Sequence, residues 1–361
     1  MQDLKYLHAL NSIPGVGLAT LRALKNNLGN FETAWAAGEE ALRSSGVRTQ
    51  ELQAILWKRP SIHPDREMEK LIRENVWLVT EDDEKYPERL KEISNPPLLL
   101  YGRGDARILK NDLTFGVVGT RRPTHYGLEA TENIVHGLVE AGVTTVSGLA
   151  TGIDARSHEA TLEAGGKTIA VLGSGVDPNS IFPPENKGLA RRIAESGGAV
   201  ISEYAPGTPA VKEHFPARNR IIAGLSRGVL VVEAREKSGA LITARFALEQ
   251  NRDVFALPGP IFSLTSTGPN KLIQEGAKLI LGSENILEEW GMGYNESKGA
   301  RGDRELEGRE KQILESLEEA LGVDALQEKT GMETSQIIAA LSMLELKGRI
   351  RSLGNDTYQK M

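Results

Sequence analysis

The residues most able to do chemistry lie in one short stretch, 212–226. Three cations, an amide and an aromatic ring fall within nine residues there: Lys212, Phe215, Arg218, Asn219 and Arg220. The stretch begins as a loop, continues as an amphipathic helix and leads into the apolar segment 228–232. A helix N-terminus attracts anions because its first N–H groups are unpaired. Cations at that position predict a phosphate site, and the ring beside them offers a face on which a base can stack.

Each of these residues taken alone has a simpler interpretation, in which the arginines are solvated and Phe215 belongs to the core. For the cluster as a whole we favour the phosphate site, because loops at the strand ends of α/β sheets commonly carry function.

Small residues follow several predicted strands, where they would let a phosphate approach the backbone. The secondary phosphate-loop candidates are Gly119, Thr120, Ser147, Gly148, Gly173, Gly175, Ser238 and Gly239. The first of these loops departs from the dinucleotide fingerprint, because Thr-Arg-Arg-Pro and not small residues follow Gly119. Arg121 in this loop is predicted to hold a phosphate through its side chain. The alternative is that Arg121 pairs with a carboxylate.

The chain offers little that suggests catalysis. Asp154 and His158 are spaced to share one helical face as an acid–base pair. No nucleophile accompanies them, so we expect Asp154 to cap a helix and His158 to be a partly exposed helical residue. No His/Asp/Glu cluster has metal-ligand spacing, and no Gly-rich loop ends in Lys-Ser or Lys-Thr. We therefore predict no catalytic residue, no metal ion and no cofactor.

Composition and charge narrow the class of protein. The 361 residues include no cysteine, which excludes disulfides and thiolate metal sites and fits an intracellular protein. The N-terminus does not resemble a signal peptide and no apolar run is long enough to span a bilayer, so we expect a cytoplasmic protein without membrane contact. The net charge of −6 is uneven: eleven acids and five bases lie in 281–320, whereas 212–252 holds eight bases and four acids. The middle of the chain is therefore locally basic.

The pattern of apolar segments predicts four regions: a helical domain at 1–65, an α/β domain at 66–291, a linker at 292–304 and a winged-helix domain at 305–361. In the central region, mostly continuous apolar runs alternate with helical segments, which indicates βαβ units and a doubly wound, mostly parallel sheet. The predicted strands are Thr114–Val118, Thr144–Ser147, Thr168–Leu172, Ala199–Ser202, Gly228–Val232, Val254–Leu257 and Lys278–Leu281. Residues 60–112 are expected to form a connector plus an edge element.

Two features of the flanking domains bear on function. Gly15-Val16-Gly17 lies between two apolar-periodic segments, as in helix-hairpin-helix DNA contacts. A tight turn that needs glycine only for steric reasons explains it equally well. In the C-terminal domain, three helices and a hairpin predict a winged helix. Its candidate recognition helix, Thr334–Leu346, has few long polar side chains, so a protein-contact role is favoured over DNA.

The loops together resemble the DNA-processing protein A family (DprA, also called Smf). The resemblance is carried by Gly119-Thr120-Arg121, by residues 147–154, 215–226, 238–244 and 254–259, and by residues 270–277 behind them. It is close over about 70–290, and the flanks match only in architecture. The resemblance implies an extended Rossmann-like domain between a sterile-alpha-motif-like domain and a winged helix. It also implies binding of single-stranded DNA without sequence preference, loading of a RecA-type recombinase, a role in natural transformation, and a homodimer formed through the Rossmann-like domain. By motif, the DNA-binding positions are Arg121, Lys212, Phe215, Arg218, Asn219 and Arg220.

The chain departs from the family pattern at three places. Phe182-Pro183 stands where Tyr-Pro is usual, Ala240 where Ser is common, and Asn251 where Gly is common. Ala240 and Asn251 are expected to lie away from the DNA pocket.

The alternative function is a nucleotide-binding or nucleotide-hydrolysing Rossmann enzyme of the lysine-decarboxylase-like type, with Asp154, Glu203 and Glu233 near one crevice. Such enzymes carry a Pro-Gly-Gly-x-Gly-Thr loop, and Pro258-Gly259-Pro260 lacks its second Gly and its Thr.

Overall fold

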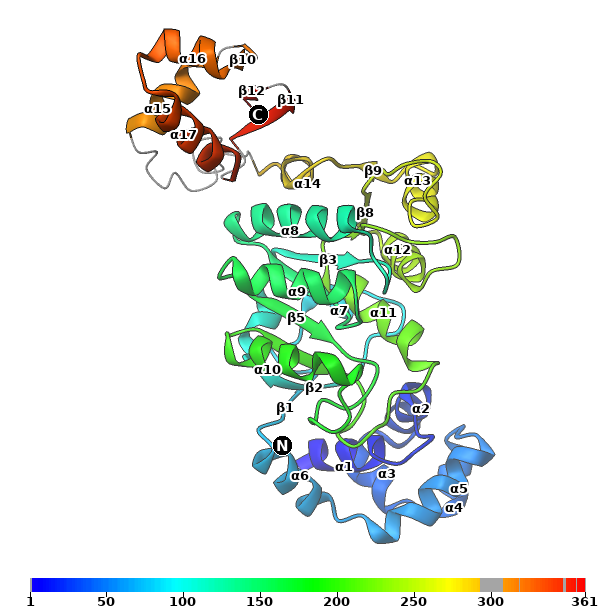
Figure 1. Ribbon diagram of the computed structural model, residues 1–361. Helices are drawn as coiled ribbons and strands as arrows, with labels where there is room; N and C mark the ends of the chain where they lie inside the picture. Colours follow the sequence, from blue (N-terminus) through cyan, green and yellow to red (C-terminus); the bar gives the residue numbers. More distant parts are fainter. Residues whose placement is uncertain (1, 293–307, 318, 347–348, 355, 361) are drawn as a thin grey trace. The chain divides into compact units, whose positions relative to one another are not determined.

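The computed structural model describes residues 2–292, 308–317, 319–346, 349–354 and 356–360 (Figure 1). The chain divides into two compact units, Met1–Tyr294 and Asn295–Met361. The predicted linker, 292–304, lies outside the described residues except for Met292. Among the helices that the structure describes, none has the length and apolar character needed to cross a bilayer.

Short helices open the first unit. They are α1 (Gln2–Asn11), α2 (Leu18–Leu28), α3 (Phe31–Ala36), α4 (Glu39–Ser44), α5 (Thr49–Lys58), η1 (Arg59–Ser61) and α6 (Pro64–Arg73). Buried apolar residues such as Leu24 and Ile55 form their common core. Helix α6 packs against α1, where Lys5 pairs with Asp65 at 2.8 Å. The domain boundary proposed at residue 65 therefore falls inside α6.

The nine strands that follow these helices in the chain form one sheet. In chain order they are β1 (Trp77–Thr80), β2 (Leu99–Gly104), β3 (Thr114–Val118), β4 (Thr144–Ser147), β5 (Thr168–Val171), β6 (Ala199–Ser202), β7 (Gly228–Val231), β8 (Asp253–Ala256) and β9 (Lys278–Leu279). In space the order is β1-β2-β6-β5-β4-β3-β7-β8-β9. The β1–β2 and β2–β6 pairs are antiparallel, and the pairs from β6 through β9 are parallel. Strands β3 to β7 are buried at every position, which explains their continuous apolar runs.

The helices of the central region cover both faces of the sheet. They are α7 (Glu88–Lys91), η2 (Ala106–Lys110), α8 (His125–Glu140), α9 (Ile153–Glu163), η3 (Pro184–Asn186), α10 (Lys187–Glu195), α11 (His214–Leu225), α12 (Gly239–Glu249), α13 (Thr267–Gln274) and α14 (Ser283–Glu289). Figure 1 shows α8, α9 and α10 side by side on one face, and α11 packs against α12. Each face of the sheet packs a hydrophobic core against its helices, and successive residues of β3 belong to different cores. Val117 packs in the core with α8 and α9, and Val118 packs in the core with α11 and α12.

The predicted fold class is confirmed, and two details differ. All seven predicted central strands exist within two residues of their expected ends. Residues 60–112 contribute more than an edge element, because β2 pairs with both β1 and β6 and so lies inside the sheet. The chain moves outward from β3 through β4, β5 and β6, then returns to the other side of β3 at β7. Open α/β sheets bind ligands at such a switch point, beyond the carboxyl ends of the strands.

The second unit is a small winged helix. Its elements are α15 (Gly308–Ser316), β10 (Leu321–Gly322), α16 (Val323–Thr330), α17 (Thr334–Leu346), β11 (Ile350–Gly354) and β12 (Thr357–Lys360). The three strands form an antiparallel sheet in the order β10-β12-β11. Ile313, Leu326, Ile337 and Leu344 form its core. The candidate recognition helix matches α17 at both ends, and Ile338 on it is half exposed.

Candidate nucleic-acid interface

A cavity of about 790 Å³ lies at the switch point, beyond the carboxyl ends of β3, β4 and β7; we call it the switch-point cavity. Its lining comes from residues 118–122, Ala150 and Asp154, Phe182, Lys212 and one side of α11, and Arg235, residues 237–240 and Thr243. Six of the lining residues are cationic: Arg121, Arg122, Lys212, Arg218, Arg235 and Lys237. Asp154 is the single carboxylate among the lining residues that the structure describes. The cavity is therefore strongly electropositive, as a phosphate site requires.

One face of α11 supplies the floor of this cavity. Phe215, Arg218, Asn219 and Ile222 line it, and the spacing i, i+3, i+4, i+7 places them on the same side of a helix. The predicted site residues Lys212, Phe215, Arg218 and Asn219 are thus brought together with Arg121, Thr120 and Gly119 from the end of β3.

Arg218 is the buried member of the group, with 4% of its surface exposed. Its Nη1 donates to the carbonyl oxygens of Gly148, at 2.7 Å, and of Val171. Its Nε donates to Asn219 Oδ1 at 3.2 Å. Burial lowers the pKa of Arg218 to about 10, and the nearby Asp154 carboxylate opposes this shift. Arg218 therefore joins α11 to the ends of β4 and β5, a structural role that the prediction of a free phosphate contact overlooked.

Asp154 is also buried, and it is not the helix cap that we expected. The N-cap of α9 is Gly152, whose φ of 83° favours glycine, and Asp154 lies in the first turn. Its Oδ2 accepts the Gly148 N–H at 3.1 Å. Burial raises the pKa of Asp154, while the charge of Arg218 acts in the opposite direction. Asp154 and Arg218 thus stabilise each other's charge beneath the cavity.

The expectation that His158 is partly exposed is wrong. Its ring is fully buried, and Nδ1 lies 2.7 Å from Thr168 Oγ1 on β5. Burial, reinforced by the positive charge of Arg218, lowers the pKa of His158 to about 3. A helical position seen in sequence alone does not tell which side of α9 faces the sheet.

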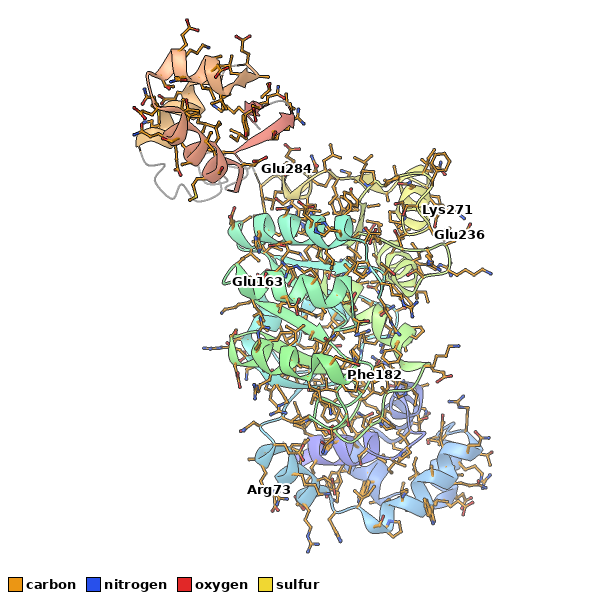
Figure 2. The ribbon with its side chains drawn as sticks, in the orientation of Figure 1. Arg73, Glu163, Phe182, Glu236, Lys271 and Glu284 are labelled. Atoms are coloured by element: carbon orange, nitrogen blue, oxygen red, sulfur yellow. The ribbon has the colours of Figure 1, made fainter. Side chains whose placement is uncertain are left out.

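Phe215 lies between a cation and a second aromatic ring. The Arg121 guanidinium sits over the Phe215 ring at 5.6 Å from its centroid. The ring of Phe182 lies on another side, with centroids 5.8 Å apart and planes at 46°. Phe182 is 42% exposed, and Figure 2 shows it at the surface. In the sequence Phe182 stands out only as a departure from a family pattern, and its place beside Phe215 was not predicted.

The other cations of the cavity are available for a ligand. Arg121, Arg122, Lys212, Arg235 and Lys237 form no ion pair with any carboxylate in the described part of the chain. The alternative in which Arg121 pairs with a carboxylate is therefore not observed. Unpaired cations around one cavity indicate an anionic ligand.

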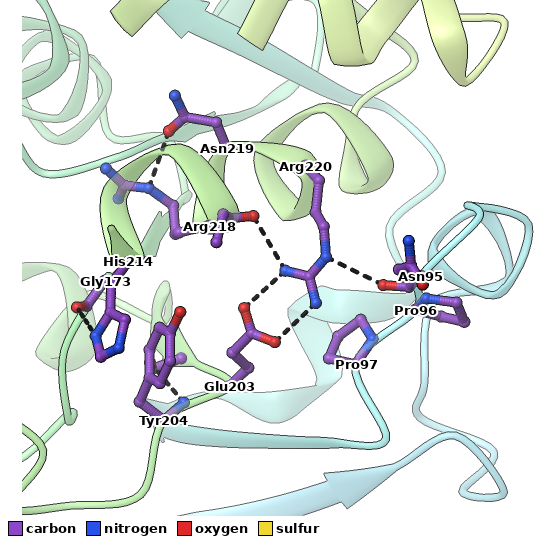
Figure 3. Close-up of polar contacts among 12 residues, drawn as sticks. Asn95, Pro96, Pro97, Gly173, Glu203, Tyr204, His214, Arg218, Asn219 and Arg220 are labelled. Carbon is purple, nitrogen blue, oxygen red and sulfur yellow. Dashed lines mark hydrogen bonds and ion pairs between the residues drawn. The ribbon is translucent and has the colours of Figure 1, made fainter. Parts of the chain in front are cut away.

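Arg220, the remaining predicted DNA-binding residue, does not line this cavity. Figure 3 shows its guanidinium on the Glu203 carboxylate, with Nη1–Oε1 and Nη2–Oε2 both at 2.7 Å. Its Nε donates to the Asn95 carbonyl oxygen at 3.1 Å. Residues two apart on a helix lie about 200° apart around its axis. Because Arg218 faces the cavity, Arg220 must face elsewhere.

The small-residue loops divide into two groups. Gly119, Thr120, Ser238 and Gly239 line the cavity, and Ser238 caps α12 by accepting the Ala240 N–H. Ala240 itself lines the cavity, contrary to our expectation. Asn219 ties this loop to α11, because its Nδ2 donates to the Gly239 carbonyl oxygen at 3.2 Å.

The second group consists of Ser147, Gly148, Gly173 and Gly175, and none of these residues lines the cavity. They serve packing instead. The Ser147 hydroxyl donates to the Val117 carbonyl oxygen at 2.6 Å. A Cβ at Gly148 would lie 2.6 Å from Arg218 Nη2, and one at Gly173 would lie 3.1 Å from Phe215 Cδ1.

The carboxylates named for the alternative, hydrolytic function are all engaged. Glu203 pairs with Arg220. Glu233 is buried and accepts hydrogen bonds from the Thr124 N–H, the Thr124 hydroxyl and the Thr265 hydroxyl. Neither Glu203 nor Glu233 lines the cavity.

One cluster with metal-ligating atoms was not apparent from sequence spacing. Single ligand atoms of Glu132, His136 and Glu163 lie within 4.8 Å of one another. Arg156 already pairs with both carboxylates, at 2.6 Å to Glu132 and 3.1 Å to Glu163. A guanidinium in that position opposes a second cation.

Comparison with known proteins agrees with this geometry. Residues 77–291 match the family described as DNA recombination-mediator protein A, and residues 298–356 match the DprA winged helix domain. Protein Smf from Synechocystis is 37% identical over 98% of this chain and 98% of its own length. The X-ray structure of DNA processing protein A from Streptococcus pneumoniae superposes with a TM-score of 0.66 at 37% identity, covering 79% of this chain and 97% of that one.

A Helicobacter pylori DNA processing protein A, solved to describe its single-stranded DNA binding mode, superposes with a TM-score of 0.54 at 30% identity. The match covers 60% of this chain and 95% of that one. The family models match both the central domain with its cavity loops and the winged helix, and Protein Smf matches nearly the whole length. The chain therefore belongs to the DNA recombination-mediator protein A family.

Proposed function

We propose that this protein binds single-stranded DNA in the switch-point cavity, without sequence preference, and that it loads a RecA-type recombinase onto the bound strand. The observation that carries the proposal is the set of unpaired cations that line one cavity together with Phe215, with Arg121 over its ring. Phosphates would bind Arg121, Arg122, Lys212, Arg235 and Lys237, and a base would stack against Phe215. Neither contact depends on base identity, since every base has a π-face.

The shape of the cavity favours a single strand over a duplex. Its volume of about 790 Å³ is in the range of small-molecule pockets and is too small for a base-paired helix. Phe215 is partly buried among Arg121, Phe182 and the α11 backbone. A base can stack on Phe215 only when it is unstacked from its neighbours. The free energy of unstacking is small in a single strand and larger in a duplex, where the base pair must also open.

Arg218 and Asn219 take part indirectly in this proposal. The Arg218 guanidinium lies in the cavity floor, where its charge raises the local electrostatic potential while it stays hydrogen-bonded to its carbonyl partners. Asn219 holds the α12 N-terminus against α11 through Gly239. Arg220 is left out of the DNA contact because Glu203 occupies it.

A homodimer would place two such cavities on one strand and multiply their affinities. We propose that the dimer forms through the β9 edge of the sheet, where Leu279 and Leu281 are exposed and Leu272 and Ile273 are half-buried. Ile280, between Leu279 and Leu281, is fully buried and belongs to the core.

The test is a fluorescence-anisotropy titration of labelled oligothymidylate and a matched duplex. If about four phosphates are neutralised, log K should fall with log salt at a slope of roughly −3, and each cation removed should reduce the slope by about 0.7. Arg121→Ala and Lys212→Ala are the test variants. Arg73→Ala is the matched control, because Arg73 is an exposed arginine on α6 far from Phe182 in Figure 2.

Equal affinity for the duplex, or variants that bind like Arg73→Ala, would move the DNA contact out of the cavity. If the protein binds no DNA at all, the lysine-decarboxylase-like alternative gains support, and release of free base from nucleoside monophosphates becomes the assay. Recombinase loading is tested separately, by whether the protein shortens the lag before a RecA-type filament forms on a strand coated with single-strand-binding protein.

A further inference from the structure

A second cavity, of about 520 Å³, lies on the other side of the start of α11; we call it the hairpin cavity. Residues 11–18, 97–99 and 203–209 line it together with His214. The two cavities meet at consecutive residues, since His214 lines the hairpin cavity and Phe215 lines the switch-point cavity. Gly173 contacts both of these residues: its carbonyl oxygen lies 3.2 Å from His214 Nδ1, and a Cβ on it would touch the Phe215 ring.

An aromatic pair forms one wall of the hairpin cavity. The rings of Tyr204 and His214 are stacked, with centroids 3.9 Å apart and planes at 16° (Figure 3). Both residues line the cavity. The carboxylate nearby, Glu203, is neutralised by Arg220 and so does not repel an anion. A stacked aromatic wall beside a phosphate site is the surface on which the next base of a strand would lie.

The Gly15-Val16-Gly17 turn, which the sequence explains either as a DNA contact or as a tight turn, also lines the hairpin cavity. Gly15 has a φ of 89°, so the turn itself requires glycine there. Gly17 has a φ of −113°, and a Cβ added to it would meet no atom within 4 Å. Neither backbone strain nor packing requires glycine at 17. What the glycine does is leave the rim of the cavity open and the first turn of α2 without a side-chain cap.

We propose that a single strand held in the switch-point cavity continues over the start of α11 into the hairpin cavity. There the next base stacks against Tyr204 and His214, and its phosphate lies at the Gly15–Gly17 turn. This inference rests on the proposed function, because it extends the same strand by one subsite. It assigns the N-terminal helices a direct part in DNA binding.

The first experiment separates charge from bulk at the rim. Gly17→Asp adds a negative charge, and Gly17→Asn adds a neutral side chain of the same size. Both are good N-cap residues, so neither should lower the stability of α2, which thermal unfolding checks. Gly38→Asp is the matched control: Gly38 is the N-cap of α4, has no side-chain cap, meets nothing within 4 Å of an added Cβ, and lines neither cavity.

These proteins are titrated with oligothymidylates of increasing length, beginning with the shortest whose binding Arg121→Ala weakens. On that shortest strand all three glycine variants should match the wild type, because it fills only the switch-point cavity. On longer strands Gly17→Asp should bind roughly five- to tenfold more weakly, as expected for one added like charge near a phosphate. Gly17→Asn can cap the same N–H groups but adds no charge, so it should weaken binding less than Gly17→Asp does. Gly38→Asp should stay within about twofold of wild type.

Equal binding of long strands by Gly17→Asp and Gly17→Asn would overturn the second subsite and leave the first intact. If Arg121→Ala binds strands of every length as tightly as the wild type does, the proposed function itself is refuted. The two failures are thus distinguishable in one data set.

A second experiment locates the base directly. 5-Iododeoxyuridine is placed at successive positions of the strand and cross-linked by light, and the modified residue is identified by mass spectrometry. Cross-links to Phe215 and to Tyr204 or His214 should come from different, neighbouring positions of the strand. Tyr204→Phe should keep the second cross-link and Tyr204→Leu should lose it. If no position cross-links to Tyr204 or His214 in a strand that cross-links to Phe215, the strand does not enter the hairpin cavity.

Discussion

Arg218 donates a 2.7 Å hydrogen bond from Nη1 to the carbonyl oxygen of Gly148, and the missing side chain of Gly148 is what leaves room for the guanidinium. The contact joins the N-terminal half of α11 to the end of β4. Arg218, which the sequence predicts to bind phosphate, therefore also stabilises the floor of the cavity.

The first prediction concerns Arg218. Arg218→Ala should lower the free energy of unfolding by about 2–4 kcal/mol, because it leaves the Gly148 and Val171 carbonyl oxygens and the buried Asp154 carboxylate without their partner. Urea denaturation measures the change. Arg121→Ala, which removes an exposed arginine, should stay within about 0.5 kcal/mol of wild type. An Arg218→Ala protein of wild-type stability that has lost only DNA binding would show that the guanidinium is a phosphate ligand after all.

The second prediction concerns Phe182. Phe182→Ala should weaken binding of oligothymidylate by about 1–3 kcal/mol if a base uses the Phe182–Phe215 pair as its stacking platform. Phe182→Tyr should bind like wild type, since the ring is kept and the hydroxyl of this half-exposed residue can reach solvent. Anisotropy titration at fixed salt measures both variants. A loss in Phe182→Tyr equal to that in Phe182→Ala would argue for a packing role instead.

The third prediction separates Arg220 from the cavity. Arg220→Ala should destabilise the fold by about 1–3 kcal/mol, because Glu203 keeps a largely buried carboxylate with no partner. The double variant Arg220→Met/Glu203→Gln should recover part of that loss. The salt dependence of single-strand binding should not change in either protein, provided that titrations are run well below the unfolding temperature. A slope reduced by about 0.7 in Arg220→Ala would mean that this arginine also contacts a phosphate.

The fourth prediction is a pH dependence of stability. Burial lowers the pKa of His158 to about 3 and that of His8 to about 4, so the folded state binds fewer protons than the unfolded state below pH 6.5. The stability that these neutral rings contribute is complete above pH 6.5 and is lost as the pH falls toward their folded values. The raised pKa of Asp154 acts in the opposite direction, above its usual value of 3.8.

His158→Asn removes one of these two histidines while keeping a side chain that can hydrogen-bond the Thr168 hydroxyl. Its unfolding free energy should therefore fall less steeply than that of wild type between pH 6.5 and 4, by up to about 1.4 kcal/mol per pH unit. Denaturant titrations at a series of pH values measure the two slopes. Parallel slopes would mean that His158 is protonated in the folded protein.

Much of the fold could be predicted because its signals are local. A parallel strand buried on both faces must be apolar at every position, so Thr114–Val118 and Gly228–Val231 stand out without any knowledge of their neighbours. Strand β2 was harder: it pairs antiparallel inside the sheet, and the prolines at 96 and 97 before it suggest an edge.

Part of the site was also within reach of the sequence. Phe215, Arg218, Asn219 and Ile222 repeat at the helical period, so their common face was implied once α11 was placed. The same period puts Arg220 on another face of the helix from Arg218. The two arginines were grouped because they are close in the sequence and share the family motif.

By itself, then, the sequence determined the class of fold, the family and the place of the site beyond the strand ends, because apolar periodicity and short loop motifs are properties of neighbouring residues. Only the tertiary structure decided the duties of the charged residues. Arg218 and Arg121 have the same side chain, yet one is buried against two carbonyl oxygens and the other lies exposed over Phe215. A cation binds within the protein when folding brings carbonyl or carboxylate oxygens from distant parts of the chain within hydrogen-bond reach of it. Otherwise it stays available for a ligand.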